Sequence, residues 1–331
     1  MPETSHSMNA SSDSFFTGWS QRLTKRLNRT GLPESAIIII TALVVGVGAG
    51  VGAYIFTLLI DLIFRVSFVN IAGFLEPITP FQYILIPAVG GLIVGVLIFK
   101  YAQEAKGHGV PEVMEAVALR GGRIRPRVAV VKALASSVCI GTGGSVGREG
   151  PIAQIGSALG STVGQLLNLS DERVRNLVAC GAAGGIAATF NAPIAGSLFA
   201  LEVILGQFHA TYFGAVVISA VTADVIAQYL EGNSRAFSVP QYSLVSGWEL
   251  LFYALLGLIA ALVSVFFSKS LYASEDLWEK IRLPEYIKPA LGGALLASGW
   301  LAAPLIACGL LKIAYDLAIW RGFRQAALPG R

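Results

Sequence analysis

The sequence predicts an all-α protein that crosses a lipid bilayer several times, through a bundle that contains broken, re-entrant helices. Of its 331 residues 54% are hydrophobic and 13% are charged, whereas a soluble domain carries about 25% charge. Long runs are almost free of charge: 33–60 holds only Glu34, and 176–201 and 203–223 hold none. Each run reaches the roughly 20 residues that span the hydrocarbon layer. Glycine is frequent, with 37 residues, as expected where helices pack closely in lipid.

The distribution of basic residues predicts the orientation in the membrane. Residues 1–33 form a polar, Ser-rich tail, disordered or amphipathic, without the apolar core of a signal peptide. Basic residues precede the first span and recur between Arg120 and Lys132, so both regions are expected in the cytoplasm. The sequence thus predicts a multi-pass protein of the inner or plasma membrane, with a cytoplasmic N-terminus. Because the basic residues lie in loops, the net charge of +4 does not indicate nucleic-acid binding.

Apolar runs and prolines give the helices in chain order. Prolines at 111, 151 and 193 suit helix starts, where the missing N–H has no partner to lose. The helices that they begin, such as 110–119, are too short to cross a membrane and are tolerated only where they line a protein-buried cavity. Broken helices at membrane depth are typical of ion and substrate sites. The expected helices are 36–64, 82–100, 110–119, 127–142, 151–168, 173–190, 193–203, 212–230, 248–280 and 286–307.

The stretch Gly141–Pro151, GTGGSVGREGP, is the centre of the predicted site. The helix after it would point unpaired N–H groups and its positive dipole end at this loop, which makes an anion site. Glu149 adds a carboxylate at membrane depth, and such a group is a functional-site hypothesis by default. The stretch 107–112, GHGVPE, has the same design, although a cytoplasmic turn with a helix cap explains that motif almost as well.

Other reactive residues indicate no metal or cofactor. Cys139, Cys180 and Cys308 lie in apolar segments without metal-ligand spacing and are interpreted as packing residues. Asp61 and Asp224 are interpreted as solvated or paired carboxylates near helix ends, and His209 as an interface residue. Gly107–Gly109 lacks the lysine and the strand of a nucleotide-binding loop.

The motifs resemble those of the CLC family of chloride channels and chloride/proton exchangers. GHGVPE at 107–112 is similar to the family's GSGIPE loop, and GREGP at 147–151 matches the family's most specific motif without change. GAAGGIAATFNAPIAGSLFALE at 181–202 resembles the helix pair that follows. The three occur in the family's order and spacing over about 36–300, so the resemblance implies a CLC-type bundle.

The resemblance also implies roles for individual residues. Glu149 would be the gating glutamate that competes with chloride or another small anion for one site. Glu202 and Val203 fall on the inner helix, where exchangers carry two adjacent glutamates and the second relays protons. A family-like homodimer follows from the resemblance, but the shortened chain counts against it. The anion-binding residues would be Gly107, His108, Gly109, Val110, Pro111, Gly147, Arg148, Gly150, Pro151 and Ile152.

Three departures from the family pattern shape the functional prediction. His108 replaces a serine whose hydroxyl binds the anion, and Val203 replaces the proton-relaying glutamate, which favours channel-like conduction. The third departure is that the GxFxP loop and the late tyrosine of the family's second half are absent after Gly293. The sequence is therefore divided into a tail (1–33), an incomplete CLC-like transmembrane domain (34–300) and an atypical tail (301–331). A non-conducting fragment or scaffold is the main alternative.

A remote alternative is an intramembrane serine hydrolase. Gly143–Gly147 matches G-x-S-x-G with Ser145 as nucleophile, and His108 or His209 would be its base. That motif requires a strand before it and an acid to orient the histidine, and the sequence provides neither.

Overall fold

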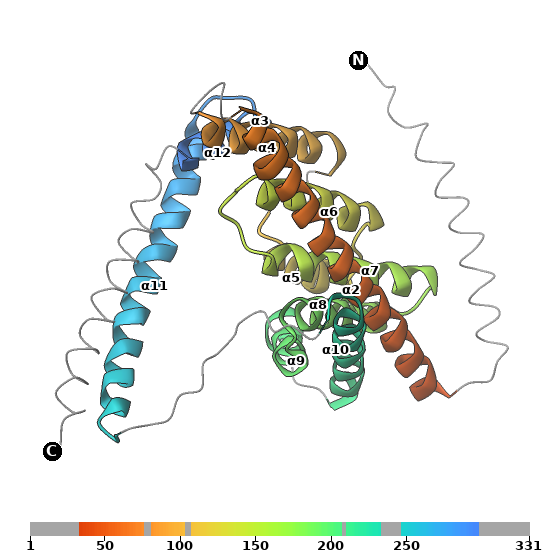
Figure 1. Cartoon of the computed structure of the whole chain (residues 1–331). Helices are drawn as coiled ribbons and strands as arrows, with labels where there is room; N and C mark the ends of the chain where they lie inside the picture. The colour runs from red at the N-terminus through yellow and green to blue at the C-terminus, as the bar shows by residue number, and fades with distance from the viewer. Residues whose placement is uncertain (1–32, 76–80, 103–106, 207–209, 233–245, 298–331) are drawn as a thin grey trace, which may run out of the picture.

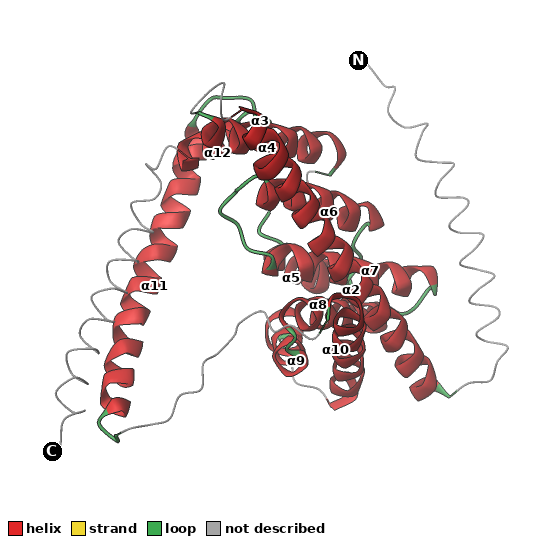
Figure 2. Ribbon diagram, in the orientation of Figure 1, coloured by secondary structure: helices red, strands yellow, loops and turns green. Residues whose placement is uncertain are grey.

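A computed structural model describes residues 33–75, 81–102, 107–206, 210–232 and 246–297 (Figure 1). Within these ranges the regular structure is entirely helical, which confirms the predicted fold class (Figure 2). The segments 1–32 and 298–331, together with His209 and Cys308, lie outside the described residues. The predicted span 286–307 is described only as α12 (Lys288–Ala297).

The first span is longer than the predicted 36–64. Helix α2 (Glu34–Phe64) continues through the π-helix η1 (Arg65–Ile71) into α3 (Ala72–Leu75). The physical reason is that the sequence contains no proline after Glu34 until Pro77, so nothing stops the helix at Phe64. The chain then returns in α4 (Gln82–Tyr101), which tolerates Pro87 in its interior.

Helix α8 (Asp171–Phe190) is the centre of the bundle and packs against α2, α7 (Glu149–Leu166) and α10 (Ala210–Glu231). Small residues allow these close contacts: a Cβ on Gly156 would overlap the carbonyl oxygen of Gly181, and a Cβ on Gly181 that of Gly156. Gly46 and Gly50 of α2 meet the α10 backbone in the same way. This is the small-residue packing of helices in lipid.

Short helices interrupt the bundle at the positions that were predicted from Pro111 and Pro193. Helix α5 (Val110–Leu119) has Pro111 in its first turn, and α6 (Pro126–Gly141) leads to the central loop. Asn191, in the left-handed conformation (φ +52°), ends α8. Pro193 then begins α9 (Pro193–Phe199), which continues as the π-helix η3 (Ala200–Leu205). These bounds lie within two residues of the predicted helices. The end of α8 at Asn191 and the start of α9 at Pro193 confirm the predicted break at 191–193.

The C-terminal described part consists of α11 (Glu249–Lys280) and α12. In Figure 1 α11 stands beside the bundle, and α12 lies against α4. Glycines again permit this contact, since the α4 residues Gly91 and Gly95 leave no room for a Cβ against the backbone of Pro289 and Tyr286.

Four helical segments in the described part of the chain are long and apolar enough to cross a membrane: Ser35–Leu75, Tyr83–Tyr101, Tyr212–Glu231 and Glu249–Lys280. Helices α7 and α8 are not among them, and most of their residues are buried against other helices.

Candidate functional site

The first half of the site is the start of α5. Gly109 is the N-cap of this helix and has φ +100°, a conformation that glycine adopts readily and other residues rarely adopt. The Gly109 N–H donates to Oε2 of Glu112 at 2.6 Å, so Glu112 caps the helix from its third position. The Glu112 carboxylate also covers Gly107, where an added Cβ would overlap Oε1. The sequence signal for this cap is the four-residue spacing Gly109-Val110-Pro111-Glu112, which sequence analysis did not use.

The second half of the site is the start of α7. The helix begins at Glu149 with Arg148 as its N-cap; the expected start at Pro151 was therefore two residues late. The expectation failed because the N–H groups of the first helical residues have no partner within the helix. A proline, which lacks an N–H, is therefore tolerated anywhere in the first turn and does not mark its first residue. Pro151 thus sits at the third helical position, and Ile152, the next residue, is fully buried and bonds back to the Arg148 carbonyl.

The two helix starts meet backbone to backbone. A Cβ on Gly109 would overlap the carbonyl oxygen of Gly150, and a Cβ on Gly150 would overlap that of His108. Two stretches about 40 positions apart in the chain are therefore joined at one point. Both helix starts carry unpaired N–H groups and a positive dipole end, so their junction is suited to an anion.

Glu149 is positioned at the edge of this junction. It is the first residue of α7 and is exposed, and its Oε2 lies over Gly147, where an added Cβ would overlap it. Arg148 beside it is half-buried. The structure therefore places the two predicted loops together, with the carboxylate of Glu149 beside them. Glu202 and Val203 lie on η3, which packs against α5, but the Glu202 side chain is exposed and makes no recorded bond to either loop.

Lys132 corrects the sequence interpretation. It was assigned to a cytoplasmic basic cluster, but it lies on α6 and is only 6% exposed. Its Nζ donates to the Gly107 carbonyl at 2.7 Å. The sequence did hold a signal, because Val128, Ala129, Lys132, Ala135 and Ser136 recur at helical spacing and all are buried.

We expect Lys132→Met to lower the free energy of unfolding by about 1–3 kcal/mol, because the Gly107 carbonyl would lose its buried partner. The measurement is denaturant unfolding of the purified chain in detergent micelles. Lys280→Met, a change at an exposed lysine at the end of α11, is the matched control. Equal stability of the two variants would show that Lys132 does not hold the loop.

His108 contacts a helix that sequence analysis did not connect to the site. Its Nε2 lies 3.6 Å from Oε2 of Glu275 on α11, and both side chains are about half exposed. Where the family's serine would stand, this chain thus places an imidazole that faces a carboxylate. No sequence signal links the two, because they are 167 positions apart.

Other candidate residues are settled by their surroundings. Asp224 is 6% exposed: its Oδ2 accepts a bond from Gln228 at 2.8 Å, while Oδ1 has no partner in the described residues. Of the two alternatives for Asp224, solvated or paired, the structure shows the paired one, through a single oxygen among the described residues; Asp61 is exposed. Helix α6, not a strand, precedes Ser145, so the hydrolase geometry is not present. Within the described residues no group of metal-ligating side chains was found.

Comparison with known proteins identifies the family. The family model "Voltage gated chloride channel" matches residues 90–318. The H(+)/Cl(-) exchange transporter ClcA of Vibrio parahaemolyticus is 34% identical over 220 residues, 64% of this chain and 46% of its own length. Chloride channel protein CLC-e of Arabidopsis thaliana is 31% identical over 313 residues, 88% of this chain and 42% of its own length.

A solved structure supports the fold. The crystal structure of a slow cyanobacterial Cl-/H+ antiporter superposes with a TM-score of 0.69 at 24% identity, over 81% of this chain and 64% of that one. The chain spans about half the length of the curated relatives that it matches. The family match runs past residue 300, so the boundary between 34–300 and 301–331 stays a prediction. With its helical membrane-protein fold and this match over more than half its length, the chain belongs to the voltage-gated chloride channel (CLC) family, whose members are membrane transport proteins and not enzymes.

Proposed function

We propose that this chain supplies the glutamate-gated, anion-binding half of a transmembrane chloride pathway. The observation that carries the proposal is the junction of the α5 and α7 starts, where Gly109 and Gly150 touch through their backbones and Glu149 stands beside them. Two adjacent helix starts, each with a positive dipole end, suit a small anion.

The geometry suggests how the site would work. Backbone N–H groups of His108, Val110 and Arg148–Gly150 would donate to the anion, and the Glu149 carboxylate would compete with it for the same donors; the Gly109 and Ile152 N–H groups are already bonded to Glu112 and to the Arg148 carbonyl. Protonation of Glu149 removes that competition. The buried Lys132 ammonium, bonded to the Gly107 carbonyl, adds positive charge behind the first loop and would raise the local affinity for an anion.

The residues on η3 favour conduction without proton coupling. A proton relay through lipid needs ionisable groups along its route. Glu202 is followed by Val203 on η3, at the position where exchangers carry the second glutamate. The relatives do not decide the matter, since one is named a channel protein and another an exchange transporter. We propose passive chloride movement, with chloride as the first anion to test.

The test needs a complete pathway. In the completed version, residues 1–293 of this chain are continued by the second half of the Vibrio parahaemolyticus relative. In liposomes we expect chloride efflux well above that of empty vesicles, without uphill proton uptake in a chloride gradient. Absence of efflux from a stably folded completed version would contradict the transport proposal.

Val203→Glu in the same completed version is the matched variant for coupling. It restores a carboxylate to the relay position, so proton movement driven by chloride should appear. Uphill proton uptake already present with Val203 would contradict the channel-like proposal and indicate another proton route.

Two further proposals concern the setting of the chain. The basic segment before the first span and the basic loop after α5 support a cytoplasmic N-terminus in the inner or plasma membrane. Accessibility of single engineered cysteines in intact cells tests this orientation. A non-conducting scaffold remains the second candidate function, favoured by the share of the relatives' length that the chain covers.

A further inference from the structure

A cavity of about 140 Å³ lies beside α5. It is bounded by α5, by the segment that joins α5 to α6, and by α7. Its lining includes three arginines, Arg120, Arg123 and Arg125, and two carboxylates, Glu112 and Glu115. Asp171, which pairs with Arg123, adds a third carboxylate beside the lining, so the positive and negative charges of this cluster balance.

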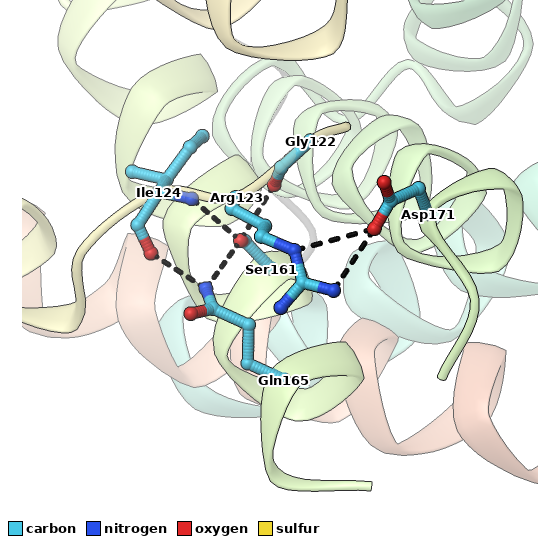
Figure 3. A network of polar contacts seen from close by, with 6 residues as sticks. All are labelled: Gly122, Arg123, Ile124, Ser161, Gln165 and Asp171. Atoms are coloured by element: carbon cyan, nitrogen blue, oxygen red, sulfur yellow. Dashed lines mark hydrogen bonds and ion pairs between the residues drawn. The ribbon is translucent and has the colours of Figure 1, made fainter. Parts of the chain in front are cut away.

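The segment that carries these arginines is held rigidly (Figure 3). Ser161 of α7 donates to the Gly122 carbonyl at 2.6 Å and accepts from the Ile124 N–H at 2.8 Å. Gln165 donates to the Ile124 carbonyl at 2.8 Å. Arg123 donates from Nε and Nη2 to Asp171 of α8. Side chains of two buried helices therefore fix the backbone on which the arginines stand, which is the preorganisation that a binding site requires.

Arg120 and Arg123 keep donors for a ligand. A guanidinium carries five N–H donors. Arg120 uses Nη2 toward Glu115, and Arg123 uses Nε and Nη2 toward Asp171. Both side chains are about half exposed, so the remaining N–H groups can reach an anion at the mouth of the cavity.

Gln154 supplies the second, independent observation. It lines the same cavity and is only 2% exposed, yet its Oε1 is buried and accepts no hydrogen bond within the described residues. A buried amide oxygen without a partner costs about 1–3 kcal/mol, and native proteins rarely leave one in that state. A donor that enters the cavity would remove this cost.

We propose that this cavity binds a phosphate group that retains a hydroxyl, with the arginines at the phosphate oxygens and Gln154 Oε1 accepting from the hydroxyl. Both features of the lining are then used: the guanidinium N–H groups of Arg120 and Arg123 that their ion pairs leave over donate to the anion, and the orphaned oxygen of Gln154 accepts from its hydroxyl. Arginine forks match the planar pairs of phosphate oxygens. Inorganic phosphate and the monoester headgroup of phosphatidate share this chemistry. The binding itself does not depend on the proposed transport function.

The cavity also touches the proposed chloride site through one residue. Glu112 lines the cavity and its carboxylate caps the Gly109 N–H at 2.6 Å. A bound phosphate group would therefore lie one side chain away from the loop at the start of α5.

The test is calorimetric titration of the full 331-residue chain in phosphatidylcholine nanodiscs, with inorganic phosphate and with sulfate at neutral pH. Sulfate has the same shape but no hydroxyl. We expect phosphate to bind about tenfold more tightly, the effect of one hydrogen bond to a charged ligand. Gln154→Leu should abolish this preference, and Arg120→Gln with Arg125→Gln should weaken both anions. Arg282→Gln, a change at an exposed arginine after α11, should leave both unchanged.

The two sources are separated by a second arm, in which phosphatidate is added to the nanodiscs and retained lipid is counted by native mass spectrometry. Binding of inorganic phosphate alone identifies a free ion, and retention of phosphatidate that is lost in Arg125→Gln identifies the headgroup. Failure of both probes to bind overturns the proposal. So does equal affinity for phosphate and sulfate, or binding that Arg120→Gln with Arg125→Gln leaves intact. Unfolding curves of each variant show whether it is folded, and Gln154→Leu removes no charge.

Discussion

Glu149→Gln should remove most of the pH dependence of chloride efflux from liposomes that contain the completed version. With Glu149 present, efflux should rise as pH falls, because protonation neutralises the carboxylate that competes with chloride at the starts of α5 and α7. For a single titrating carboxyl group, the ionised fraction that competes with chloride changes by up to about tenfold per pH unit. A tenfold change corresponds to about 1.4 kcal/mol. Glutamine keeps the shape of the protonated side chain and cannot ionise, so its efflux should be high and nearly flat.

The control for this prediction is Glu279→Gln, a change at an exposed glutamate near the end of α11. It should leave the pH profile as it was. If the glutamine variant at 149 kept the full pH dependence, Glu149 would have no part in gating, and the carboxylates near the loops, Glu112 first, would have to be examined.

The 331-residue chain alone should insert in membranes but release chloride no faster than empty vesicles. Moving a small ion from water into a dry protein interior costs on the order of 20 kcal/mol in an idealised estimate, and still several after relaxation. A helix N-terminus returns up to ~2 kcal/mol, and each hydrogen bond to a charge about 1.5–3 kcal/mol. The two helix starts seen here are part of the set that the resemblance implies, so the balance stays unfavourable.

The comparison that decides this prediction is the chain alone against the completed version in the same lipid. Saturable efflux from the chain alone, with a pH dependence that Glu149→Gln removes or a rate that Gly150→Leu abolishes, would show that it builds its own pore, for example as an oligomer. Efflux insensitive to both changes would indicate leaky vesicles. The Gly150→Leu change is informative because any side chain there meets the His108 carbonyl.

The helices followed from the sequence because they rest on local signals. Apolar runs fix where a helix crosses the bilayer, and Pro111 and Pro193 fix where short helices start. The meeting of 107–111 with 147–151 followed from the family resemblance and is present in the fold. The roles of these residues in anion binding and gating stay predictions.

Features that depend on distant partners could not be predicted. Nothing in the local sequence shows that His108 faces Glu275, or that Asp224 is buried with one oxygen unpartnered. The orphaned oxygen of Gln154 likewise depends on where α5 and α7 lie relative to each other. The predicted span 36–64 missed the extension through η1, although no proline interrupts the sequence between Glu34 and Pro77.

The buried Lys132 has a consequence for how this protein is made. A lysine at the centre of an isolated helix raises the cost of its insertion from the translocon by about 2.5–3.5 kcal/mol, and α6 has only 16 residues to offset it. The partner that accepts the ammonium, the carbonyl of Gly107, is synthesised 25 positions earlier. Helix α6 is therefore expected to leave the translocon together with α5 rather than alone, so that membrane entry and loop assembly become a single cotranslational event.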